Sequence, residues 1–223
     1  ATSCKQLGVA RALLHSASLH HWFLYPLYPL LHPPTEEMTG TPLQTGFSFY
    51  YMRRSKKGNT ALDGDAQAKL NDKASFTDAV KIIGTARTIE EFWSIYNYLV
   101  RPHDLPATTD YHFFREGVKP TWEDPYNVNG GRWTIRLPKR GLLGSRYWEE
   151  VMLSLLGGFP DVPDGEVCGA VISVRGHEDV LSVWNKTSNN QRVVGRIKDG
   201  LKKMLRLPSH APMRYHNHPR TPA

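Results

Sequence analysis

The sequence predicts an α+β domain in which helices pack on one face of an antiparallel sheet. Strand-like and helix-like segments are interspersed, and most connections between them are too short for the crossovers that parallel strands need. The composition agrees, since 40% of the 223 residues are hydrophobic and 11% are aromatic, enough for one sizeable core. The other face of such a sheet is left to hold a ligand.

The chain divides into three stretches. Residues 1–40 are poor in acidic residues, and four prolines within 26–34 exclude a long helix there. We therefore expect residues 1–40 to be a poorly ordered N-terminal extension, residues 41–216 the folded domain and residues 217–223 a C-terminal tail. The run HNH at 216–218 then spans the end of the domain and the start of that tail.

The domain begins with an aromatic segment, FSFYYM at 47–52, which is typical of a strand. A polar stretch rich in glycine and aspartate follows at 55–72 and predicts a long loop. The short apolar segment AVKIIG at 79–84 predicts the next strand.

A helix is predicted at 88–99. Its N-terminus has the spacing of a capping box, in which Thr88 and Glu91 each accept a hydrogen bond from the other's backbone, and apolar residues recur at helical spacing after it. Two alternating segments, 110–115 and 132–137, predict the strands that follow.

The C-terminal half holds two more helices and three strands. A helix at 145–158 ends in glycine, and a hairpin is predicted from 166–175 and 179–185. A third helix, basic on its outer face, is expected at 189–207, and 213–216 predicts a final strand.

Charge and motifs exclude several classes of protein. The net charge of +7 indicates either an anionic partner or simply solubility. Two cysteines, Cys4 and Cys168, are too few for a disulfide framework and favour a reducing compartment, and no stretch of 18 apolar residues predicts a membrane span. No sequence motif of a nucleophile, phosphate-binding loop or metal site occurs, so we expect no catalysis, metal or cofactor.

The stretch KPTWEDPYNVNGGRW at 119–133 is the most informative. Trp122 can stack on a base, Glu123 can accept the N–H donors of a guanine edge, and Arg132 can bind phosphate. The alternative is a core tryptophan beside a surface Glu–Arg pair. Arg175 and Trp184 end the two strands of the predicted hairpin, so we expect them near each other, with Arg175 a second phosphate ligand or a solvated side chain.

These motifs resemble the messenger-RNA cap-binding family of translation initiation factor 4E. The matching text is KPTWED, NGGRW, EEFWSIYNYL, CGAVISVR and VLSVWNK, in the family's order from about Thr41 to Tyr215. RYWEE and WNK resemble the divergent class II, or 4E-homologous, branch. The resemblance implies a curved antiparallel sheet with three helices on its convex face and the cap site on the concave face.

The resemblance also implies site residues. The cap-base ligands are Phe76, Trp122, Glu123 and Trp184, and the phosphate ligands are Arg132 and Arg175, with His177 and Lys186 as substitutes. A substitute is needed because a basic ligand of the general factor is Val180 here. Phe76 stands where that factor has tryptophan, so weaker cap binding is expected.

A partner site on the convex face is implied as well, for proteins that carry a Tyr-x4-Leu-apolar helix. Its residues are Pro42, Ile89, Trp93, Glu150 and Leu153. Trp93 shares a helical face with Ile89, so core packing is its alternative role. We expect a monomer located in the cytoplasm, with a nuclear pool as a second option.

The function implied is cap binding that regulates translation, as a weak-binding class II repressor or modulator. One alternative is a general initiation factor that recruits the scaffold subunit. A second is a cap-blind protein-interaction module. A nucleotide enzyme such as a cap hydrolase is disfavoured, because neither metal-binding acids nor a nucleophile accompany Trp122.

Overall fold

The structure is a computed structural model that describes residues 40–53, 79–208 and 210–219. The expectations for the N-terminal extension, the loop at 55–72 and Phe76 therefore lie outside the described residues.

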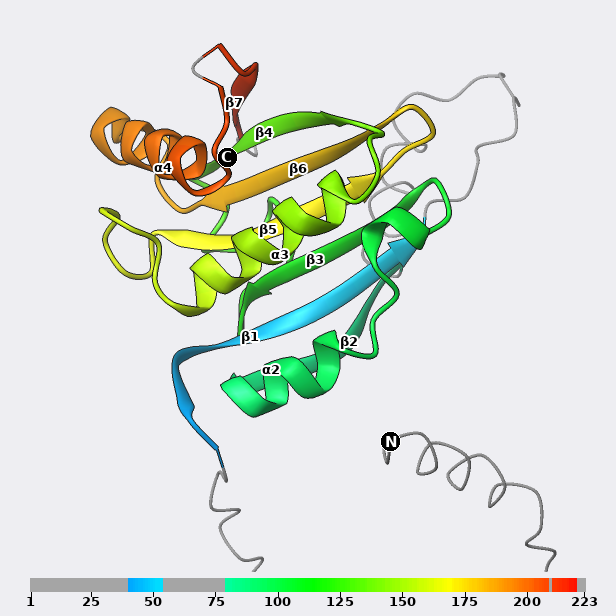
Figure 1. Cartoon of the computed structure of the whole chain (residues 1–223). Helices are drawn as coiled ribbons and strands as arrows, with labels where there is room; N and C mark the ends of the chain where they lie inside the picture. The colour runs from blue at the N-terminus through cyan, green and yellow to red at the C-terminus, as the bar shows by residue number, and fades with distance from the viewer. Residues whose placement is uncertain (1–39, 54–78, 209, 220–223) are drawn as a thin grey trace, which may run out of the picture. The chain divides into compact units, whose positions relative to one another are not determined.

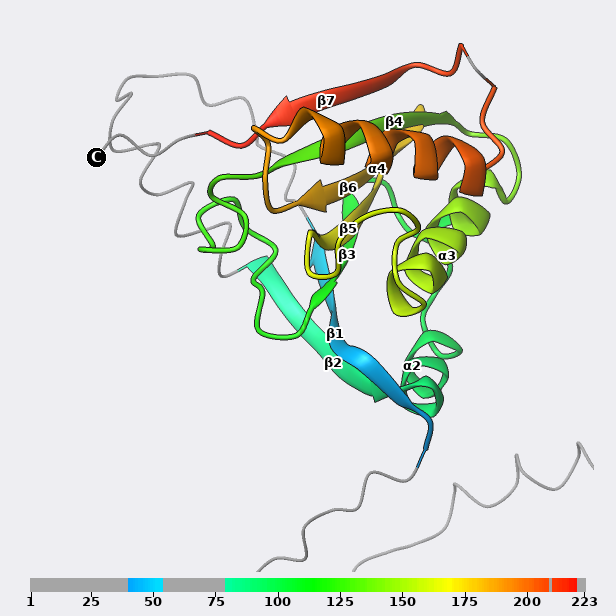
Figure 2. The same cartoon turned by 90° about the vertical axis from the view of Figure 1, so that its left-hand side faces the viewer.

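Seven strands form one antiparallel sheet in the order β2-β1-β3-β5-β6-β4-β7. The strands are β1 (Pro42–Arg53), β2 (Val80–Thr88), β3 (Thr109–Arg115), β4 (Gly131–Pro138), β5 (Val167–Val174), β6 (Glu178–Asn185) and β7 (Met213–Asn217). The helices are α2 (Ile89–Tyr96), the short 3-10 helix η1 (Pro102–Asp104), α3 (Leu143–Leu156) and α4 (Gln191–Met204). Figures 1 and 2 show the twisted sheet with α2, α3 and α4 laid against it. The predicted fold class is confirmed.

The three long helices share one face of the sheet, here called the helix face. Their buried residues form a single core with inward residues of the strands, including Phe92 of α2, Trp148 of α3 and Ile197 of α4. The opposite face, here called the site face, carries a smaller cluster. Its buried members are Phe114, Val118, Cys168, Val171 and Trp184, and the partly buried Tyr50 and Trp122 pack against them.

The strand sequences serve both faces because successive side chains point to opposite sides of a sheet. In β3, Phe113 lies in the helix-face core and its neighbour Phe114 in the site-face cluster. In β6, Val183 and Trp184 divide in the same way. Near-continuous apolar runs therefore mark strands that are buried on both sides.

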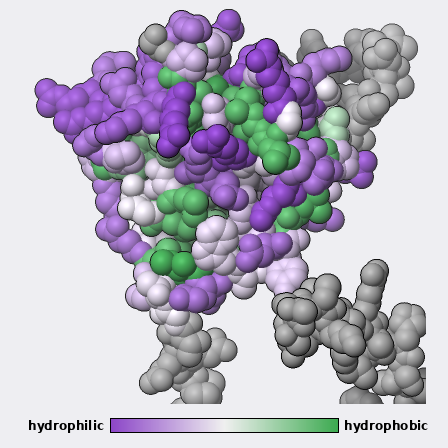
Figure 3. Space-filling model, viewed as in Figure 1, coloured by the Kyte–Doolittle hydropathy of each residue, from purple (hydrophilic) through white to green (hydrophobic). Residues whose placement is uncertain are grey.

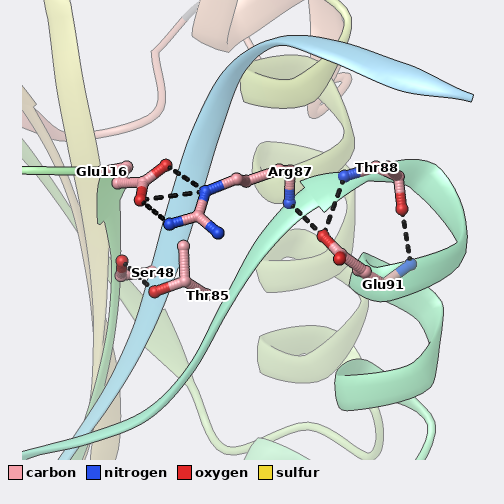
Figure 4. A network of polar contacts seen from close by, with 6 residues as sticks. All are labelled: Ser48, Thr85, Arg87, Thr88, Glu91 and Glu116. Atoms are coloured by element: carbon pink, nitrogen blue, oxygen red, sulfur yellow. Dashed lines mark hydrogen bonds and ion pairs between the residues drawn. The ribbon is translucent and has the colours of Figure 1, made fainter. Parts of the chain in front are cut away.

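The capping box at the start of α2 is confirmed. Thr88 Oγ1 accepts a hydrogen bond from Glu91 N at 3.1 Å, and Glu91 Oε2 accepts from Thr88 N at 3.2 Å (Figure 4). On the sheet beside it, Arg87 forms a forked pair with Glu116 across Gly46 of β1. A Cβ at Gly46 would lie 2.3 Å from the Glu116 carboxylate, so a side chain here would displace that carboxylate from its present position.

One boundary was wrong. Residues 217 and 218 were expected in a tail, but β7 pairs with β4 as far as Asn217, and His218 is only 4% exposed. The backbone N–H of His218 also donates to Gly130 O at 3.0 Å. The folded domain therefore includes both residues, because edge pairing with β4 extends beyond the short apolar signal of the strand.

Candidate nucleotide-binding site

Strand register aligns Trp184 and Arg132 on the site face. Trp184 of β6 lies opposite Arg132 of β4, and Arg132 lies opposite His216 of β7. Residues directly opposite in antiparallel strands share a face. The Arg132 guanidinium carbon lies 5.5 Å from the Trp184 ring, and Phe114 contacts that ring edge-on at 5.4 Å. The positively charged guanidinium of Arg132 thus lies close to the ring of Trp184, a residue that is 8% exposed.

Trp122 and Glu123 lie in the loop between β3 and β4, and Trp122 is half-buried against the site-face cluster. The two acids after Trp122 differ in environment. The Asp124 carboxylate is buried and accepts hydrogen bonds from Lys119 N at 3.0 Å and Tyr126 N at 2.9 Å. Asp124 therefore closes the loop, and Glu123 is the acid suited to meet a ligand.

Asn127 braces the same loop from within. Its side-chain Nδ2 donates to Lys119 O at 2.9 Å and to Thr121 O at 2.8 Å. Asn127 is fully buried, so these bonds are shielded from water. The segment before Trp122 is thereby held in place.

The glycine pair that ends the loop is a packing requirement. A Cβ on Gly130 would lie 1.9 Å from Asn185 O, and one on Gly131 would lie 2.5 Å from Tyr215 Oη. The loop therefore closes tightly against β6 and β7. Arg132 is the next residue after this glycine pair, so the tight closure of the loop that carries Trp122 also fixes the position of Arg132.

The expectation that Arg175 and Trp184 lie near each other was wrong. The hairpin turns at residues 175–178, and Trp184 pairs with Gly169 at the far end. Arg175 lies six residue steps beyond Gly169, about 20 Å along the strand at roughly 3.3 Å per step. In an antiparallel hairpin the C-terminal ends of the two strands lie at opposite ends of the hairpin, so two residues that each end a strand are far apart.

Arg175 is held by a buried carboxylate. Its Nη1 donates to Asp110 Oδ1 at 2.7 Å, and Asp110 is completely buried. His177 is exposed in the turn beside Arg175. Lys186 is exposed beyond the opposite end of β6, where its Nζ lies 4.8 Å from the Tyr126 ring. The structure thus brings His177 together with Arg175, and Lys186 with the Trp122 loop.

The five partner-site residues lie around the N-terminal part of α2 and along α3. Pro42 pairs with Thr88 at the start of α2, and both Ile89 and Leu153 are 40% exposed. Trp93 is partly exposed while its ring contacts Phe92 edge-on at 5.1 Å, and Glu150 pairs with Arg146 on α3. Apolar patches lie over α2 and between α2 and α3 in Figure 3.

Helices α2 and α3 are linked below this surface. Tyr96 Oη donates to Glu149 Oε2 at 2.7 Å, and burial raises the pKa of Tyr96, with the Glu149 hydrogen bond adding to the effect. This hydrogen bond therefore ties α2 to α3. Trp93 is only partly buried, so its ring is accessible to a docking partner.

The Cys168 thiol is buried in the site-face cluster. Burial raises the pKa of the Cys168 thiol to about 12, with Glu166 contributing, so the thiol stays protonated at neutral pH. Within the described ranges no group of three metal-ligating side chains occurs, and none of the helices has the length and apolar run of a bilayer span. A groove of about 680 Å³ lies between residues 160–163 and α4, apart from Trp122 and Trp184.

Three functional candidates were missed at the sequence level: Asp124, Asn127 and His218. Asp124 and Asn127 were visible as turn-forming residues whose side chains bond nearby backbone. His218 gave no local signal, because its role depends on the pairing of β7 with β4.

The family model for eukaryotic initiation factor 4E matches residues 42–222. Among curated relatives, eukaryotic translation initiation factor NCBP of Oryza sativa subsp. japonica is 39% identical over 177 residues, covering 79% of this chain and 71% of the relative. Eukaryotic translation initiation factor 4E-4 of Caenorhabditis elegans is 40% identical over 147 residues, covering 66% of this chain and 68% of the relative.

Solved structures that are similar to this chain are also of eIF4E proteins. C. elegans eIF4E-3 in complex with the 4E-binding protein Mextli and a cap analog has a TM-score of 0.68 and 31% identity, covering 81% of this chain and 94% of that chain. Ascaris suum eIF4E-3 with m7G cap has a TM-score of 0.68 and 33% identity, covering 82% and 93%. The resemblance seen in the sequence is confirmed, and the chain belongs to the eukaryotic initiation factor 4E family.

Proposed function

We propose that this chain binds the 7-methylguanosine cap of messenger RNA and thereby regulates translation in the cytoplasm. The observation that carries the proposal is the alignment of Trp184 and Arg132 beside the Trp122 loop on the site face, in a chain similar to proteins solved with a cap or cap analog. An aromatic ring, a guanine-edge acceptor and a guanidinium are the groups that a capped nucleotide requires.

The chemistry of the base explains the choice of residues. Methylation at N7 gives guanine a delocalised positive charge, which aromatic faces attract by about 0.5–2 kcal/mol per ring. Trp122 supplies one face, and Phe76 is proposed to supply the other. Glu123 accepts the N1 and N2 protons as a charge-assisted pair. Trp184 lies nearby as the proposed contact for the N7 methyl.

The phosphates of the nucleotide are proposed to run along β6. Arg132 lies at the Trp184 end of this strand, and Arg175 and His177 lie at its hairpin end. Only Nη1 of Arg175 is used in its hydrogen bonds to other described residues, which leaves further N–H donors for phosphate. His177 lies beside Arg175, whereas Lys186 lies beyond the other end of β6. His177 is therefore the better placed substitute for the basic ligand that Val180 replaces.

The test is a fluorescence titration of the protein with 7-methyl-GTP and with GTP. We expect the methylated nucleotide to bind about ten- to a thousand-fold more tightly. Trp122→Ala removes this preference, and Trp93→Phe, a change on the helix face, keeps it. Equal affinity of the parent protein for both nucleotides contradicts the proposal.

A weak-binding class II repressor or modulator is the finer form of the proposal. Two positions support this form. Val180 stands where the general factor has a basic phosphate ligand, and Phe76 stands where it has tryptophan, so weaker cap binding is expected. Restored growth of cells that lack their general factor, on expression of this chain, favours a general initiation factor instead. Retention of the parent protein on cap resin that disappears in Trp122→Ala excludes the cap-blind module.

A protein partner is proposed for the helix face. A segment with a Tyr-x4-Leu-apolar helix would pack its apolar side against Ile89, Trp93 and Leu153, which the partial exposure of these residues permits. The similarity to a protein solved with a 4E-binding protein supports this. Trp93→Ala is expected to abolish capture by such a peptide on beads and to leave 7-methyl-GTP binding in place.

A further inference from the structure

His218 lies where the C-terminal strand returns to the site face. Its backbone N–H donates to Gly130 O at 3.0 Å, and its side chain is 4% exposed. The imidazole packs on the Trp184 ring, with 4.3 Å between ring centroids and 50° between planes. A residue near the end of the chain thus covers one of the proposed cap ligands.

The same imidazole is tied to the loop that carries Trp122. His218 Nδ1 lies 2.7 Å from Asn127 O. A carbonyl oxygen only accepts, so Nδ1 carries the proton and donates. Asn127 in turn holds Lys119 O and Thr121 O through its side chain. One ring therefore joins two parts of the site face that are 57 residues apart along the chain, Asn127 and Trp184.

Burial favours the neutral form of this ring. Burial lowers the pKa of His218, the hydrogen bond to Asn127 raises it, and the nearby positive charge of Arg132 lowers it again. With the proton on Nδ1, the neutral imidazole has a lone pair on Nε2. A neutral ring adds no positive charge next to the place proposed for a cationic base.

Plain packing does not explain a histidine at this position. His218 Nε2 and Trp184 Nε1 are both buried without a hydrogen-bond partner among the described residues. Leaving a buried polar group unpaired costs about 1–3 kcal/mol, which an apolar ring would avoid. An aromatic residue such as phenylalanine would cover Trp184 equally well but would not donate to Asn127. The Nδ1–H donor is therefore the property that distinguishes histidine from phenylalanine at position 218.

We propose that His218 is a positioning residue of the cap site, which holds the Trp122 loop and the Trp184 indole in a fixed relation before the nucleotide binds. The inference rests on the proposed function, because it assigns this linkage to cap recognition. A preformed site loses less conformational freedom on binding. Loss of the linkage should reduce binding of the methylated base most, since that base uses both tryptophans.

The experiment separates the two halves of the linkage with full-length variants. His218→Asn keeps a side-chain donor near Asn127 and removes the ring, whereas His218→Phe keeps the ring and removes the donor. His218→Ala removes both, and His210→Ala is the matched control, since His210 is an exposed histidine of a surface turn. Each variant is titrated with 7-methyl-GTP and GTP. Amide hydrogen exchange of Tyr126, Asn127 and Gly130 is measured without nucleotide.

We expect His218→Ala to weaken 7-methyl-GTP binding about tenfold, to change GTP binding less, and to speed exchange of the loop amides. His218→Asn should restore slow exchange in part, and His218→Phe should not. His210→Ala should match the parent protein.

Failure of this inference is distinguishable from failure of the proposed function. If the parent prefers 7-methyl-GTP while His218→Ala keeps both its affinity and its loop exchange, the role of His218 is overturned and the function stands. If the parent binds both nucleotides equally, the function fails, and the exchange rates alone decide whether His218 holds the loop. Should His218→Ala not fold, His218→Asn and His218→Phe decide the matter instead, because parent-like exchange in both contradicts the linkage.

Discussion

The two faces of the sheet are built from the same strands and differ in what they bury. The helix face buries mainly apolar side chains, such as Phe92, Trp148 and Leu181, and a few polar ones such as Asp179, which pairs with Lys139. The site face buries a smaller apolar cluster together with polar groups, among them Asp110 and His218. Burying polar groups is costly unless each is paired. The contrast indicates that the helix face supplies stability and the site face uses part of it to hold charged and aromatic groups in place.

The largest expected effect is on the helix face. Phe92 is completely buried and stacks near Phe49 and Tyr96, so Phe92→Ala should reduce the free energy of unfolding by about 3–5 kcal/mol. Trp122→Ala on the site face should cost far less stability yet abolish the preference for 7-methyl-GTP. Urea unfolding and nucleotide titration of both variants measure this. Similar stability losses would break the distinction between the faces.

The next effect concerns the buried ion pair on the site face. Arg175→Met removes the charge-assisted bond that Arg175 donates to the buried Asp110 carboxylate and should reduce stability by about 1–3 kcal/mol. The control is Arg136→Met, because Arg136 pairs with Glu178 at the surface, where such pairs contribute about 0–1 kcal/mol. Chemical denaturation compares the two. Equal losses would mean that burial of Asp110 has no energetic consequence.

Adjacent acids sharpen the division between binding and structure. Glu123→Ala should weaken 7-methyl-GTP binding by about 1–3 kcal/mol because two base donors lose their acceptor, with little change in thermal stability. Asp124→Ala should lower thermal stability as well, because Lys119 N and Tyr126 N lose the carboxylate that closes the loop. Calorimetric titration and melting curves test both. A stable, binding-competent Asp124→Ala would refute the structural role of that acid.

A smaller effect is expected at the edge of the helix face. Thr88→Ala removes the cap of α2 and should cost about 1 kcal/mol of stability. Ser94→Ala on the same helix is the control, since Ser94 only bonds back to Glu91 O. Cap binding should not change in either variant. A loss of 7-methyl-GTP affinity in Thr88→Ala would show that the two faces are coupled.

The smallest expected effect is the pH dependence from His218. Its pKa is lowered in the folded state, so the unfolded state binds more protons as the pH falls below about 6.5. Stability from the neutral ring is complete above that pH and is lost as the pH falls through the folded pKa. The charged or titratable groups on the surrounding elements include Glu123, Asp124, Arg132, Lys186 and His216, together with Lys119, Tyr126, Cys168 and Tyr215.

The measurement is the unfolding free energy of the parent protein and of His218→Phe between pH 7.5 and pH 5.5. The parent should lose stability relative to the variant as the pH falls. Parallel curves would show that His218 does not titrate differently in the two states.

Local sequence accounts for most of the fold. The capping box placed the start of α2 at Ile89, and every strand was recognised from aromatic or β-branched residues. Helix ends were less accurate, as α4 ends at Met204 and not at 207. Helix ends depend on the contacts around the last turn, which a residue pattern does not contain.

The sequence by itself determined the alternating strands, the three helices and the neighbourhood of Trp122, Glu123 and Arg132, because these depend on residues close together in the chain. Only the tertiary structure decided that Arg175 meets Asp110 at the end of the sheet away from Trp184, and that His218 covers Trp184. The physical reason is strand register. Strand register is set by hydrogen bonding between segments that are far apart in the sequence, and no local pattern of residues shows which of them will lie opposite each other.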